Sequence, residues 1–315
     1  MTAPADLATT RSRRLAYWQS ACCLALLLVA AYVARHHWPT VETGAVRLAV
    51  ADQGWLLVGA TAAVATWASS ALAQQGAVPR RLPGGRLVAA QFAASAANHV
   101  LPAGLGAGAV NLRFLMRCGL PAGRAASALA VKATAGVVAR GALIAALAAA
   151  CPGLLRLPRI PAVACAAGLA AVVLLAVLPR TPLWPRCRRA LRAVLADIRA
   201  VHAKPPRAAA LWGGSLAFAA LHSLVLIAVT QAVELPLSPL RVALLYLAAS
   251  SAAALLPTPG GIGSLDAALA FALTVNGAPG AAAASAVLGY RLLTVWLPLV
   301  PGLLVLGVLM RRNAL

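Results

Sequence analysis

The chain has 315 residues, of which 62% are hydrophobic and only 10% are charged. A soluble domain carries about a quarter charged residues to cover its surface, so this composition excludes an ordinary soluble domain. The 27 Lys and Arg residues outnumber the 6 Asp and Glu residues, for a net charge of +21. We interpret this excess as the basic loops of a membrane protein rather than as a nucleic-acid-binding surface.

Six apolar runs follow one another along the chain, each long enough to cross a membrane. They cover residues 16–34, 54–75, 127–150, 162–179, 211–231 and 283–309. Roughly 18 or more apolar residues cross a hydrocarbon core of about 30 Å, where the backbone must satisfy its own hydrogen bonds. The runs show no two-residue alternation of the barrel type. They predict an all-α polytopic membrane protein whose first run is an uncleaved helix rather than a signal peptide.

Two further apolar stretches, 87–117 and 242–275, are each broken near the middle by Pro and Gly. The breaks contain Pro102, Gly104 and Gly106 in the first stretch, and Pro257, Pro259, Gly260, Gly261 and Gly263 in the second. Each half would rise only roughly 20–24 Å as a helix, which is short of the membrane core. We predict two re-entrant hairpins; two short tilted spanning helices per stretch, giving eight or more helices, are the alternative.

The positions of the cations orient the chain. With a cytoplasmic N-terminus, the inside segments hold 18 Lys and Arg residues and the outside segments hold 5. This ratio predicts a multi-pass protein of the inner or plasma membrane with both termini in the cytoplasm. Residues 1–14 would form a cytoplasmic tail and 180–210 a basic cytoplasmic loop. Within that loop, apolar residues at helical spacing predict a basic helix, lying on the inner leaflet or solvated as a linker.

The two broken stretches resemble each other within what we expect to be a single transmembrane domain, 1–315. Gly119, Pro121 and Ser127 recur 158 residues later as Gly277, Pro279 and Ser285. The loop count places the first hairpin opening on the cytoplasmic side and the second on the outer side. Two such units, predicted at 54–150 and 211–309, form an inverted repeat typical of transporters with a site at the broken helices. Kinked structural helices are the alternative.

Charged residues inside the apolar stretches are the first candidates for a binding site, because a charge at mid-membrane costs about 2.5–3.5 kcal/mol. Asp266 follows the second break, where it either caps a helix or pairs with Arg291. Lys132 and Arg291 are placed deep enough to bind a phosphate. Arg113 could do the same, or could extend to the membrane surface from a helix end.

Uncharged polar residues add to this candidate substrate site. Asn98, His99 and Gln91 in the first hairpin could hydrogen-bond a headgroup or satisfy backbone groups at the break. Tyr290, next to Arg291, belongs to the same candidate set. The sequence has no phosphate-loop, zinc or nucleophile-elbow motif. It therefore predicts no catalytic residues, no metal, no cofactor and no enzymatic activity.

The same polar segments carry a family resemblance. Asn98 to Gly104 with Arg113, and Leu256 to Gly263 with Asp266 and Arg291, resemble the lysylphosphatidylglycerol synthase transmembrane-region family of flippase-like membrane proteins. The resemblance covers roughly residues 15–310, and Asp266 stands where the family usually has a glutamate. It implies translocation of a phospholipid or a lipid-linked precursor, with membrane lipids as partners. Since the chain stops at Leu315, we expect no C-terminal synthase domain and no synthesis of aminoacylated lipid.

Three functions remain open at the level of the sequence. The first is a flippase-like transporter for a lipid headgroup. The second is a small-solute or ion-coupled transporter of the same architecture. The third is a non-transporting membrane partner of a cell-envelope glycosyltransferase, docked through the 180–210 loop. None involves nucleic acid, and the sequence does not specify the substrate or the oligomeric state.

Overall fold

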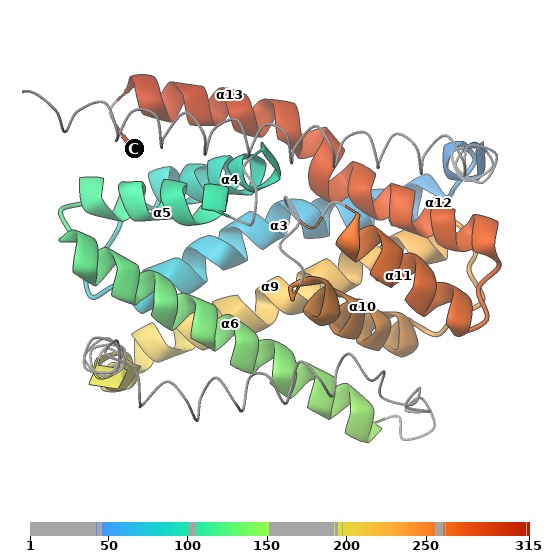
Figure 1. Ribbon diagram of the computed structural model, residues 1–315, viewed down its shortest axis with the longest axis horizontal. Helices are drawn as coiled ribbons and strands as arrows, with labels where there is room; N and C mark the ends of the chain where they lie inside the picture. The colour runs from blue at the N-terminus through green and yellow to red at the C-terminus, as the bar shows by residue number, and fades with distance from the viewer. Residues whose placement is uncertain are drawn as a thin grey trace, which may run out of the picture.

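A computed structural model describes residues 46–100, 105–150, 198–255 and 263–312, together with single positions at 42, 192, 195, 196, 261, 314 and 315. In this part of the chain the regular elements are all helices (Figure 1). They are α3 (Gln53–Ala77), α4 (Gly84–Val100), α5 (Leu105–Arg117), α6 (Ala122–Ala150), α9 (Pro205–Ala232), α10 (Pro239–Ala253), α11 (Ser264–Val275), α12 (Gly280–Arg291), the π-helix η5 (Leu292–Trp296) and α13 (Leu297–Arg311). The all-helical prediction is confirmed.

Four helical segments of the described chain are long and apolar enough to cross a membrane. They are α3, α6, α9 and the continuous segment Gly280–Arg311, which joins α12, η5 and α13. These correspond to four of the six predicted runs. The other two runs, 16–34 and 162–179, lie outside the described residues, as do the tail 1–14 and residues 180–191, 193, 194 and 197 of the 180–210 loop.

The two broken stretches form two helix pairs, α4 with α5 and α10 with α11, at opposite ends of the bundle (Figure 1). Their helices are 12 to 17 residues long, or roughly 18–26 Å. Asn98 and His99 at the inner end of α4 line the same cavity as Thr66, halfway along α3, so this hairpin reaches the middle of the bundle. This arrangement favours re-entrant hairpins over paired spanning helices. The breaks themselves, at 101–104 and 256–260, lie outside the described residues and include Pro102, Gly104, Pro257, Pro259 and Gly260.

The turns that follow the two hairpins have the same backbone hydrogen bonds, 158 residues apart. The N–H of Leu120 donates to the carbonyl of Leu115 at 3.1 Å, and Ala278 donates to Leu273 at 3.0 Å. Between these residues, Gly119 and Gly277 both have a positive φ, 84° and 95°, a conformation that glycine adopts without the strain of a side chain. The two turns therefore end α5 and α11 in the same way, as the sequence repeat predicts.

Helices α3 and α9 pack antiparallel, with their backbones in close contact near the C-terminal end of α3. A Cβ atom on Gly76 would lie 2.3 Å from the backbone nitrogen of Leu211, and one on Gly214 would lie 2.5 Å from that of Ala73. Small residues at such contacts let membrane helices pack closely. Side chains of α4, α5 and the second half of α3 contribute to one buried apolar cluster. Side chains of α10, α11, α12 and the second half of α9 contribute to another.

Candidate functional site

A cavity of about 320 Å³ lies between the two apolar clusters, where the two hairpins approach each other. Every helix from α3 to α12 contributes at least one residue to its wall in the described part of the chain, and so does the π-helix η5. Its polar lining consists of Thr66, Trp67, Ser70, Gln91, Ser95, Asn98, His99, Asn111, Lys132, His222, Tyr246, Tyr290, Arg291 and Thr294. This lining combines two cations with amides, hydroxyls and imidazoles, and its described residues include no carboxylate.

On the side of the first hairpin, Lys132 of α6 is bound by uncharged groups. Its ammonium donates to the hydroxyl of Ser70 and to the amide oxygen of Gln91, both at 2.9 Å. The Ser70 hydroxyl donates to the same Gln91 oxygen at 2.8 Å, and Gln91 donates through Nε2 to Asn111 at 2.6 Å. An ammonium has three N–H donors, so one remains without a partner among the described residues. Lys132 thus brings a positive charge to the cavity with no acidic partner in that part of the chain.

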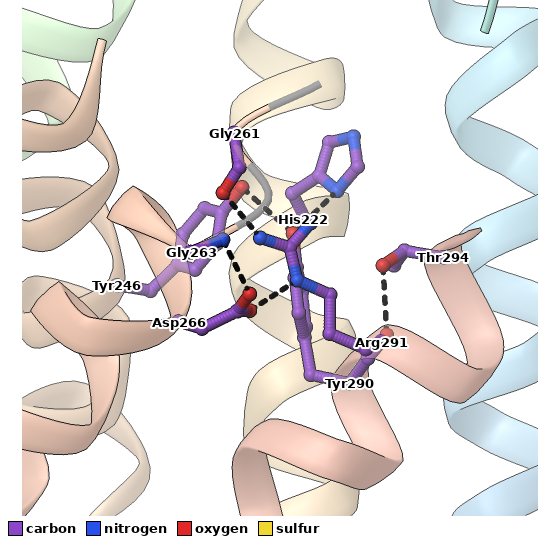
Figure 2. A network of polar contacts seen from close by, with 8 residues as sticks. All are labelled: His222, Tyr246, Gly261, Gly263, Asp266, Tyr290, Arg291 and Thr294. Atoms are coloured by element: carbon purple, nitrogen blue, oxygen red, sulfur yellow. Dashed lines mark hydrogen bonds and ion pairs between the residues drawn. The ribbon is translucent and has the colours of Figure 1, made fainter. Parts of the chain in front are cut away.

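On the side of the second hairpin, Arg291 of α12 forms an ion pair with Asp266 of α11 (Figure 2). Its Nη2 also donates to the carbonyl of Gly261 at 2.6 Å. Asp266 in turn accepts from the N–H of Gly263 at 2.9 Å, which caps the start of α11. Both roles proposed for Asp266 are therefore present: it caps the helix and pairs with Arg291. The arginine side chain is 7% exposed and the aspartate 31%.

A cluster of rings extends the second side of the cavity. The hydroxyl of Tyr290 donates to that of Tyr246 at 3.0 Å and lies 3.2 Å from Nδ1 of His222 (Figure 2). The three residues come from α12, α10 and α9 respectively. Tyr290 lies 158 residues after Lys132, so the two repeats place different chemistry at the same position of the cavity wall.

The π-helix η5 begins directly after Arg291, at Leu292. Its wider turn is a local departure from α-helical geometry that occurs often at functional sites. Here it directs three consecutive residues, Leu293, Thr294 and Val295, to the cavity wall. The Thr294 hydroxyl donates back to the Tyr290 carbonyl at 2.7 Å (Figure 2). No pattern in the sequence predicted this feature.

The predicted site residues divide into three groups. Asn98, His99, Lys132, Tyr290 and Arg291 all line the cavity. Asp266 lies behind Arg291 and reaches the cavity only through it. Arg113 is exposed on α5 and lies outside the cavity lining.

Other cavity residues were not predicted from the sequence. Ser70, Asn111, His222 and Tyr246 are polar residues on mostly apolar helices that also carry other polar side chains. Polar residues within candidate membrane helices were the available signal, but the charged residues took precedence in the prediction. Their convergence on one cavity depends on helix packing, which no local pattern in the sequence specifies.

Comparison with known proteins gives a family for the whole membrane region. The family model described as the lysylphosphatidylglycerol synthase TM region matches residues 20–302. A search of curated proteins found no match. The chain therefore belongs to the lysylphosphatidylglycerol synthase transmembrane-region family.

Proposed function

We propose that this family member is a flippase-like transporter that takes the phosphate-containing headgroup of a phospholipid or lipid-linked precursor into the central cavity. The observation that carries the proposal is that two cations, Lys132 of α6 and Arg291 of α12, line one cavity. A phosphate-containing headgroup would bring negative charge into the cavity, and the described lining has no carboxylate to supply it.

The unused donors of both cations support a phosphate ligand. Arg291 has five N–H donors, of which one binds Asp266 and one binds Gly261 among the described contacts. The remaining donors can bind phosphate oxygens in the two-pronged manner of guanidinium. Asn98 makes no side-chain hydrogen bond within the described chain and lines the same cavity, so its amide can bind a glycerol or sugar hydroxyl.

The size and position of the cavity support a headgroup rather than a whole lipid. Its volume of about 320 Å³ is at the small end of ligand sites, which range from about 300 to 1,000 Å³. The acyl chains would stay among the exposed apolar side chains of the outer helix faces. In inverted-repeat transporters the broken helices place the substrate near the midplane, where either repeat can open. The same geometry would allow headgroup passage here.

A reconstitution experiment tests the proposal. Proteoliposomes would carry a trace of phosphatidylglycerol with a fluorescent headgroup, and a membrane-impermeant quencher would report its appearance in the outer leaflet. The wild-type protein should speed this exchange over empty liposomes. Lys132→Met should reduce the rate about tenfold or more, since a lost charge-assisted contact is worth roughly 1.5–3 kcal/mol.

Arg113→Met is the matched control, because it removes one cation from an exposed position outside the cavity. It should leave the exchange rate unchanged. Equal rates for wild type and Lys132→Met would contradict a headgroup site in this cavity. Uptake of soluble phosphate without lipid exchange would instead support the small-solute transporter. Co-purification of an envelope enzyme with a transport-inactive protein would support the partner role.

A further inference from the structure

A second cavity, of about 430 Å³, lies at the end of the bundle where the first hairpin opens. It is lined by the end of α3, the α5–α6 turn and the start of α9. Three of its residues are arginines: Arg80, Arg124 and Arg207. The remaining lining residues are Ala77, Pro79, Gly119, Leu120, Pro121, Ala128 and Ala200, so the described wall contains no acidic side chain.

We propose that this basic cavity is a binding site for a phosphate-type anion, separate from the central cavity. The positive-inside tendency explains why basic residues gather at one end of a membrane protein. It does not explain why three arginines from three segments line one concave volume. Arg81 and Arg86, also exposed at this end, do not line it.

The positions of two arginines strengthen the proposal. Arg124 and Arg207 each lie at the third residue of a long helix, α6 and α9, and neither helix has an acidic residue in its first turn. The macrodipole gives a helix start a partial positive charge, which disfavours cations there. An arginine at the start of α6 is therefore unfavourable for that helix alone. A bound anion would offset the charge of Arg124, and the N–H groups of the first turn of α6 would add to its binding.

The third arginine, Arg80, is held in place by the turn between α5 and α6. Nη1 of Arg80 donates to the carbonyl of Gly119 at 3.2 Å. A Cβ atom on Gly119 would lie 3.2 Å from that same nitrogen, so the glycine leaves room for the guanidinium. The remaining N–H donors of Arg80 can then bind an oxygen-rich anion in a defined direction.

The shared ligand chemistry is a phosphate group, which can come from an anionic lipid headgroup or from a soluble phosphate. Two probes distinguish these sources with the purified full chain in detergent. One is phosphatidylglycerol added in micelles, compared with phosphatidylcholine, and the other is inorganic phosphate. Binding is read by native mass spectrometry for the lipid and by a shift of the melting temperature for phosphate. All measurements use the Lys132→Met background, which weakens the central site, so that the binding measured comes mainly from the basic cavity.

Arg124→Gln and Arg207→Gln should each weaken binding of the preferred probe about tenfold or more. Arg81→Gln is the matched control, and it should bind as tightly as its parent. Arg124 is exposed, so this variant stays informative if Arg207→Gln fails to fold. Selective binding of phosphatidylglycerol supports a lipid site, and binding of inorganic phosphate supports a soluble ligand. Absence of binding for both probes, or equal losses in Arg81→Gln and Arg124→Gln, would overturn the proposal.

Discussion

The two hairpins enter the bundle from opposite ends and reach the same cavity, yet different forces hold them there. Around α4 and α5, an uncharged network of amides and a hydroxyl surrounds Lys132. At α11, an ion pair connects the second hairpin to α12 through Arg291 and Asp266. Two copies of one architecture can therefore place a cation at the cavity with or without a counter-ion. This difference predicts which side tolerates the loss of its cation.

The second hairpin should be the more sensitive to loss of charge. Arg291→Met removes one partner of a mostly buried ion pair and the donor to Gly261, which leaves Asp266 uncompensated. Breaking such a pair costs about 3–5 kcal/mol. We expect a loss of about 3 kcal/mol in the free energy of unfolding, because Asp266 keeps part of its exposure. Equilibrium unfolding in detergent measures it.

The double variant Asp266→Asn with Arg291→Met sharpens this test. Removing both charges should recover about 1 kcal/mol or more relative to Arg291→Met, because no unpaired carboxylate remains. The amide introduced by Asp266→Asn would still offer an oxygen to the N–H of Gly263. A double variant as unstable as the sum of the two single changes would show that the ion pair does not couple the two helices.

The first hairpin should instead be most sensitive to crowding. Gly106 at the start of α5 packs against α4, where a Cβ atom would lie 2.1 Å from the carbonyl oxygen of Ala97. Gly106→Ala should therefore reduce the free energy of unfolding by about 2 kcal/mol, as overpacking typically does. Gly108→Ala is the matched control, since its Cβ atom would meet nothing within 4 Å. It should stabilise the protein by up to about 1 kcal/mol through helix propensity.

In the second hairpin, Gly263 is needed for its backbone conformation rather than for close packing. Gly263 has open space around it but a φ of 84°, which costs an L-residue roughly 1–2 kcal/mol. Gly263→Ala should lose about that much in a thermal or denaturant unfolding experiment. Gly263→Asn should lose less, because asparagine tolerates this conformation better. Equal losses for both would indicate a packing defect rather than backbone strain.

Local sequence signals predicted much of this fold. The long apolar runs predicted α3, α6, α9 and Gly280–Arg311, and the glycine and proline breaks predicted both hairpins. The offset of 158 residues anticipated the matching turns at Gly119 and Gly277. These elements could be predicted because the length of a membrane-spanning helix, the conformation of a turn and the break in a helix depend on residues close in sequence.

The residues that line the cavity were harder to predict, because they depend on which helix faces pack together. For Arg113 the sequence left two roles open, a phosphate ligand or a side chain that extends to the membrane surface, and the structure places it exposed on α5 and outside the cavity lining. Its counterpart 158 residues later is Phe271, which is also exposed. The two repeats thus place this position on the outside of the bundle in both copies. His222 and Tyr246 have no such guide, since they reach Tyr290 only through the packing of α9 and α10 against α12.

The smallest change in stability is expected for Lys132, the α6 cation that contacts the first hairpin through Gln91. In Lys132→Met the bond from Ser70 to Gln91 and the bond from Gln91 to Asn111 can both persist, and no carboxylate in the described chain loses its partner. The free energy of unfolding should therefore change by less than about 1 kcal/mol, since the network keeps its own donors and acceptors satisfied. Affinity for phosphatidylglycerol should nevertheless fall, so Lys132→Met would separate binding from stability where Arg291→Met affects both. A loss of stability as large as that of Arg291→Met would mean that Lys132 anchors the first hairpin as the ion pair anchors the second.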